Sequence, residues 1–121
     1  MTEIRNTKRY DLEERTLRFA QRVREFVKKL PKTLANVEDS RQLIDASGSV
    51  GANYIEANEA LSKKDFTMRA KICRKEAKES RYWLRLVDTG GSRELERERK
   101  ELEGEADELT HIFGAIVTKS K

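Results

Sequence analysis

Residues 43–61 read LIDASGSVGANYIEANEAL, and small or apolar side chains recur in this stretch at steps of four and three. Steps of this kind place the side chains on one face of an α-helix, whereas a half-buried strand would alternate at every second residue. The first line of such residues is Leu43, Ser47, Val50, Tyr54, Ala57 and Leu61. A second line beside it is Ile44, Gly48, Gly51 and Ile55. The stretch therefore predicts a helix with a wide apolar face.

The two glycines leave two interpretations of this stretch. Each glycine costs about 1 kcal/mol relative to alanine in a helix interior, so Gly48 and Gly51 could mark a loop that splits the segment. Alternatively, the helix is continuous, and its small residues let a neighbouring backbone approach closely. We favour the continuous helix because the apolar period runs through both glycines without a change of phase.

The same period recurs on both sides of this stretch, so the chain is predicted to be all-α. Pro31 disfavours helix at the residue before it, Ser62 suits a helix N-cap, and Gly90-Gly91 is a C-terminal signal. Short connections between long helices imply one domain, an antiparallel up-down-up-down four-helix bundle. The predicted helices span about residues 10–30, 37–60, 63–89 and 93–117.

Composition narrows the class of protein. The 121 residues fit one domain, and the 36% of apolar residues suits helices with one core stripe each. No apolar run reaches the ~18 residues of a transmembrane helix, and the first residues lack the apolar stretch of a secretory signal. Cys73 is the only cysteine, so no intrachain disulfide can form. We therefore expect a cytoplasmic protein with no membrane partner.

The charge of the chain alternates from one predicted helix to the next. Residues 1–32, 33–61, 62–92 and 93–121 carry net charges of +5, −4, +5 and −2. In the predicted topology each basic helix lies between two acidic ones, so lateral ion pairs would explain the alternation. Exposed pairs contribute only ~0–1 kcal/mol each. The total of +4 is therefore weak support for an anionic ligand.

No catalytic constellation stands out in the sequence. His111 is the only histidine, so a two-histidine carboxylate metal site cannot form. Glu56-x-x-Glu59 and Glu76-x-x-Glu79 place carboxylates one turn apart, and ordinary ion-paired surface residues explain them better than a cation site. Cys73 lies on a core line, where we expect a small buried hydrophobe and not a nucleophile. The sequence predicts a protein that is not an enzyme and that carries no metal or cofactor.

A basic line on the third predicted helix is the sharpest candidate for a binding site. Its members are Lys64, Lys71, Arg74, Lys78, Arg81 and Arg85. From Lys71 to Arg85 the line covers about 21 Å at 1.5 Å per residue, and such a line could follow a phosphate backbone. The alternative is a solvated flank whose cations pair with an acidic neighbouring helix.

Spare apolar surface on the second and third predicted helices suggests self-association. A helix that is apolar over more than half its circumference usually has a second neighbour, and aromatic residues are favoured at interfaces. The predicted interface residues are Tyr54, Ile55, Ile72, Trp83 and Leu86.

Several segments resemble the bacterial 23S rRNA intervening sequence proteins. The longest is Ser49–Ala60, SVGANYIEANEA, and it is followed by SKKDF at 62–66. KEAKESRYWL at 75–84, Leu30-Pro31-Lys32 and Gln42-Leu43 are also similar, so the resemblance covers nearly the whole chain. One departure is Asp45-Ala46, where the family more often has arginine and serine. It bears on local contacts and not on membership.

The resemblance implies a four-helix bundle that forms a homopentameric ring, encoded within insertions in large-subunit ribosomal RNA genes and elsewhere in bacterial genomes. The chain is also similar to the accessory variability protein of diversity-generating retroelements. That protein is a basic pentameric barrel that associates with a reverse transcriptase and nucleic acid. The resemblance implies no catalytic residues.

Two functions follow as hypotheses. The first is a non-enzymatic ring that binds RNA or DNA through basic flanks, namely the line from Lys71 to Arg85 and a basic first helix with Arg15, Arg18, Arg22, Lys28 and Lys29. The second is a protein-docking scaffold, or accessory subunit of a nucleic-acid enzyme, that uses the apolar surface left over from the core.

Overall fold

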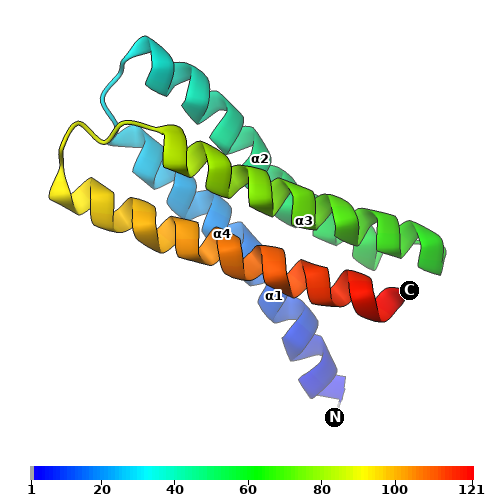
Figure 1. The fold of residues 1–121 in the computed structure, drawn as a ribbon. Helices are drawn as coiled ribbons and strands as arrows, with labels where there is room; N and C mark the ends of the chain where they lie inside the picture. The colour runs from blue at the N-terminus through cyan, green and yellow to red at the C-terminus, as the bar shows by residue number, and fades with distance from the viewer. Residues whose placement is uncertain (1) are drawn as a thin grey trace.

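The structure, a computed structural model, describes the backbone of residues 2–121 and the side chains of residues 12–121. It contains four α-helices and no strand in this range (Figure 1). The helices are α1 (Thr2–Lys28), α2 (Leu34–Asn58), α3 (Lys63–Leu86) and α4 (Arg93–Ser120). The all-α prediction is therefore confirmed.

The helix ends differ from the predicted ranges for local reasons. α2 begins at Leu34, before the predicted residue 37, because the Thr33 hydroxyl caps it by accepting from the Asn36 amide at 3.1 Å. α3 ends at Leu86, before the predicted residue 89, because Val87 is extended. Gly90 and Gly91 then adopt positive φ values of 68° and 80°, a conformation that favours glycine. α1 starts at Thr2 and ends at Lys28, and α4 extends to Ser120.

α2 is continuous through its glycines, so that interpretation is confirmed. A Cβ on Gly51 would lie 2.8 Å from Thr16 Oγ1 and 3.2 Å from Thr16 Cβ. The glycine therefore lets α1 approach α2 more closely than any larger residue would allow.

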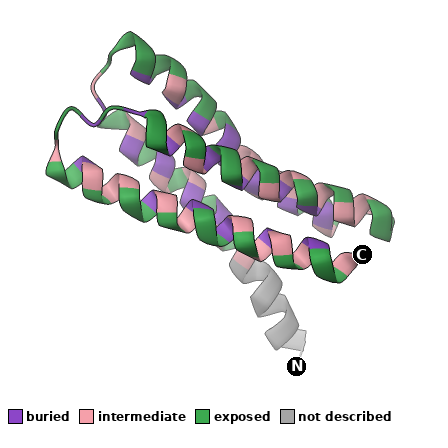
Figure 2. Ribbon diagram, viewed as in Figure 1, coloured by how far each residue is buried: buried purple, intermediate pink, exposed green. Residues whose placement is uncertain are grey.

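The helices surround one core. α1 and α3 each lie beside α2 and α4, and within the described residues the backbones of α1 and α3 are not neighbours. The buried residues line the inner side of every helix (Figure 2). The largest fully buried side chains include Phe19, Phe26 and Phe113.

Asn36 joins the two connections at one end of the bundle. Its amide Nδ2 donates to the carbonyl oxygens of Pro31 at 2.9 Å and Asp88 at 2.8 Å, and its Oδ1 accepts from the Asp88 amide at 2.8 Å. Only 2% of Asn36 is exposed. These bonds hold the start of α2 beside the end of α3. At the other end, Thr67 Oγ1 donates to Ser120 Oγ at 2.9 Å and joins α3 to α4.

Candidate nucleic-acid interface

Four carboxylates of α4 pair with cations on or just after α1. The ion pairs are Arg15 with Glu105 and Glu108, both at 2.7 Å, Arg22 with Glu101 at 3.3 Å, and Lys29 with Glu98 at 2.8 Å. The hydrogen bond to Glu105 raises the pKa of Arg15 above its ordinary value, and the hydrogen bond to Glu98 does the same for Lys29. The predicted lateral pairing of helices therefore exists between α1 and α4. It neutralises much of the basic first helix, which we had predicted as a second binding surface.

The basic line of α3 is different. We call its six members, Lys64, Lys71, Arg74, Lys78, Arg81 and Arg85, the α3 stripe. The stripe lies on the side of α3 that faces α4, because the Arg74 Cδ atom is 3.7 Å from the place where a Cβ on Gly114 would lie. Lys64, Lys71, Lys78 and Arg85 are exposed, and Arg74 and Arg81 are half-buried.

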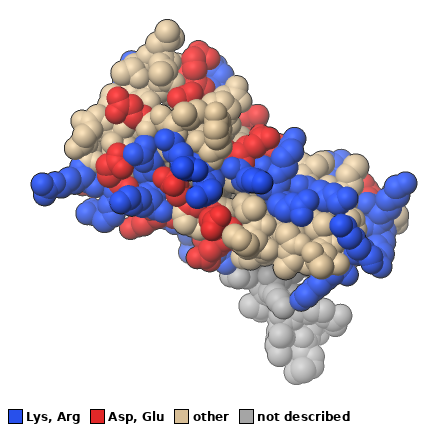
Figure 3. All heavy atoms as spheres, in the orientation of Figure 1, with Lys and Arg blue, Asp and Glu red and all other residues tan. Residues whose placement is uncertain are grey.

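None of these six cations forms an ion pair with any residue whose side chain the structure describes. The pairing that would have made the stripe an ordinary solvated flank is therefore not found within residues 12–121. Figure 3 shows lysine and arginine side chains gathered along α3 on this face of the molecule. The chemistry that such a line offers is electrostatic contact with successive phosphates.

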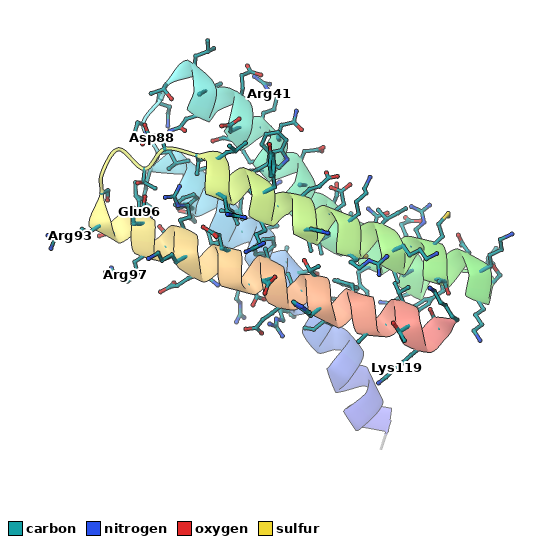
Figure 4. The ribbon with its side chains drawn as sticks, in the orientation of Figure 1. Arg41, Asp88, Arg93, Glu96, Arg97 and Lys119 are labelled. Atoms are coloured by element: carbon teal, nitrogen blue, oxygen red, sulfur yellow. The ribbon has the colours of Figure 1, made fainter. Side chains whose placement is uncertain are left out.

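Further cations on α4 extend the positive surface, and they were not among the predicted binding residues. Arg93, Arg97 and Lys100 are exposed and form no ion pair within the described residues. Figure 4 shows Arg93 and Arg97 projecting outward at the start of α4 and Lys119 at its far end. Their steps of four and three were the available signal, but the net charge of −2 over residues 93–121 concealed it.

Two adjacent aromatic residues lie near the α3 stripe, and one of them is exposed to solvent. Tyr82 is 57% exposed, whereas Trp83 is half-buried and packs against the core. Their ring centroids are 5.1 Å apart in an edge-to-face arrangement. Tyr82 follows Arg81 directly, so its ring is the one placed to stack on an unpaired base.

The predicted interface residues do not lie together. Tyr54 is only 7% exposed, and its ring packs edge-to-face on Phe113 at 5.7 Å, so the structure places it in the core. Its position on the first apolar line explains this burial, since that line faces the core. Ile55 lies in a groove between α1 and α2. Ile72, Trp83 and Leu86 follow Arg69 at helical steps along α3, and Arg69 donates to Asn53 of α2, so they lie toward the α2 side of α3.

The remaining candidate groups offer no reactive site within the described residues. Cys73 is fully buried, and burial raises the pKa of its thiol to about 12. Its sulfur lies 3.4 Å from the carbonyl oxygen of Val50. No three His, Cys, Asp or Glu side chains in residues 12–121 come together as a metal site. Nor does any helix of this part combine the length and apolar character that a membrane crossing needs.

Both the sequence and the fold of the chain are similar to those of known proteins. The family model of the 23S rRNA-intervening sequence protein matches residues 8–115. A solved structure of a protein of unknown function from the S23 ribosomal protein family of Bacteroides thetaiotaomicron has a TM-score of 0.75 and 27% identity to this chain. The similarity covers 92% of this chain and 98% of that one. No match is found among curated proteins.

Proposed function

Because the chain belongs to the 23S rRNA-intervening sequence protein family, we propose that it is a non-enzymatic protein that binds RNA or DNA through the α3 stripe. Its antiparallel bundles assemble into a homopentameric ring. The observation that carries the proposal is the contrast between two basic helices. Arg15, Arg22 and Lys29, on and just after α1, have carboxylate partners on α4, whereas the cations of the α3 stripe have none in the part of the chain that the structure describes.

Electrostatics supports this use of the stripe. Like charges one helical turn apart repel each other, and no carboxylate among the described residues lies within ion-pair distance of the stripe cations. A polyanion laid along the stripe would replace the repulsion with attraction and release its own counterions. Exposed Tyr82 adds a stacking surface, which favours single-stranded segments.

The test is equilibrium binding of a fluorescent single-stranded RNA and an RNA hairpin. Changing Lys71, Arg74, Lys78 and Arg81 to Gln should weaken binding of both. A control variant with Arg15, Arg22, Lys28 and Lys29 changed to Gln has the same net charge and removes only cations that are already ion-paired, so it should bind nearly as well as the wild type. Equal affinity of the wild type and the stripe variant would refute the proposal.

A protein-docking scaffold, or accessory subunit of a nucleic-acid enzyme, is the second candidate. The observation that favours it is a surface hollow at the start of α3 that is lined in part by Met68, which is 49% exposed. Leu61, which precedes α3, is 99% exposed. The scaffold becomes the better account if the stripe variant keeps its RNA affinity and changing Leu61 and Met68 to Ser has no effect on RNA binding.

A further inference from the structure

The four-helix bundle has four side faces, and two of them already have a described role. The face between α1 and α4 carries the ion pairs, and the face between α3 and α4 carries the α3 stripe. The two faces that flank α2 remain. Each of them combines apolar side chains with a charge that lacks a good partner.

The face between α1 and α2 has two largely apolar hollows, and Arg24 is at the first of them. The apolar lining of the first is Leu17, Ala20, Gly48, Gly51, Ala52 and Ile55, and Glu13, Thr16 and Gln21 line it as well. The second includes Val27, Val37 and Ile44. Arg24 is exposed, and its Nη2 lies 3.4 Å from the place where a Cβ on Gly48 would be. Its only hydrogen bond among the described residues goes to the Ala20 carbonyl oxygen of its own helix, at 3.1 Å.

The face between α2 and α3 has the inverse pattern, with apolar side chains on both sides of an acidic centre. Ile72 lies at one end, Trp83 and Leu86 at the other, and Glu76 and Glu79 between them. The Glu76 side chain is 17% exposed, and its cation partner among the described residues is Lys75 at 3.7 Å. Burial, followed by the nearby Glu79, raises the pKa of Glu76, so this carboxylate lacks sufficient compensation.

The two patterns lie at the same level along the bundle. Arg69 Nη1 donates to Asn53 Oδ1 at 3.0 Å, and Cys73 Sγ lies beside the Val50 carbonyl oxygen. Continuing along α3, Glu76 is about one turn beyond Cys73 and therefore lies level with Ser47 and Gly48. That is the level of Arg24. Ile72 is accordingly level with the first hollow, and Trp83 and Leu86 are level with the second, near Val37.

We propose that these two faces bind each other in successive copies of the chain. Ile72 fills the hollow at Gly51, Arg24 of one copy pairs with Glu76 of the next, and Trp83 with Leu86 covers the hollow at Val37. This inference rests on the ring in the proposed function and supplies its interface. A closed ring relates its copies by rotation without translation along the axis, so two faces can join only if their matching features are level.

The positions of the two faces also determine the shape of the ring. They are adjacent faces of a four-helix bundle, so they point about 90° apart, which closes a ring of about four or five copies when the bundle axes lie along the ring axis. α2 then faces the central channel with its exposed carboxylates Glu38, Asp45, Glu56 and Glu59. The α3 stripe faces outward. Nucleic acid would accordingly bind around the ring and not pass through it.

A charge swap tests the interface, with the mass of the particle measured by sedimentation and native mass spectrometry. Arg24→Glu and Glu76→Arg should each weaken assembly by about 30-fold or more, because each leaves like charges at a desolvated contact. The double variant should recover assembly to within about threefold of the wild type. Arg97→Glu, which makes the same charge change on the outer side of α4, should leave the particle mass unchanged.

Ile55→Asp is a second test of the interface that does not depend on the folding of the Glu76 variant. Ile55 is 53% exposed in the single chain, so its replacement leaves the core intact. It should give a folded monomer by circular dichroism and sedimentation. A wild-type ring whose mass is unaffected by these three changes, or a double swap that stays dissociated, overturns the interface and leaves the ring itself standing. A monomeric wild-type protein overturns both the interface and the ring, and RNA affinity, measured separately, decides the nucleic-acid part of the proposed function.

Discussion

The clearest quantitative prediction concerns the salt dependence of RNA binding after Lys71 and Lys78 are changed to Gln. Both side chains are exposed, and neither forms an ion pair within residues 12–121. The double change therefore removes two phosphate contacts and no described intramolecular one. For single-stranded RNA each contact contributes about 0.7 to the slope of log K against log salt, so the slope should become less steep by about 1.4. At 0.1 M salt this corresponds to about a 25-fold loss of affinity.

The assay is fluorescence anisotropy between 50 and 200 mM salt, with an RNA short enough to follow the ~21 Å from Lys71 to Arg85 of one copy. The matched control is the double variant Arg22→Gln and Lys29→Gln, which makes the same change in net charge. Its cations already pair with Glu101 and Glu98, so its slope should equal that of the wild type. If the two double variants lower the slope equally, only net charge matters, and the reasoning from unpaired cations is wrong.

Three other predictions test the fold. Asn36→Ala should lower the free energy of unfolding by about 2–4 kcal/mol in urea titrations, because three buried hydrogen bonds are lost and their partners stay unpaired; a loss under 1 kcal/mol would contradict it. Gly51→Ala should destabilise by about 1–3 kcal/mol, because its Cβ meets Thr16 at 2.8 Å. Gly104→Ala, which meets nothing within 4 Å, should instead stabilise by about 0.5–1 kcal/mol; equal effects would refute the close contact. Cys73, with its pKa raised to about 12, should resist alkylation of the native protein at about pH 8 and react only after unfolding, and rapid labelling of the native thiol would disprove its burial.

Much of the fold was predictable from the sequence because the apolar period states which side of each helix is buried. The positions 43, 47, 50, 54 and 57 are buried as the steps of four and three require. The period runs through Gly48 and Gly51, and so does the helix. Helix ends were less predictable, because they depend on particular capping bonds. The Thr33 hydroxyl, for example, starts α2 before its apolar stripe begins.

The candidate site was predictable only in part. The spacing of the α3 stripe showed that its cations share a face, but not whether carboxylates neutralise them. That depends on which neighbouring helix the carboxylates of α4 face, and Glu98, Glu101 and Glu105 face α1. Of the predicted interface residues, Tyr54 lies on the line that faces the core, and it is buried there.

Lysine acetylation with and without RNA, followed by peptide mass spectrometry, tests most directly whether the α3 stripe is the nucleic-acid interface. Lys64, Lys71 and Lys78 are exposed in the free protein, so reagent should reach all three. Lys28 and Lys32 are exposed on the part of the chain around the end of α1 and serve as internal controls. The account predicts that RNA protects the three α3 lysines and leaves the two controls as reactive as before. Protection of Lys28 and Lys32 with no protection on α3 would contradict it.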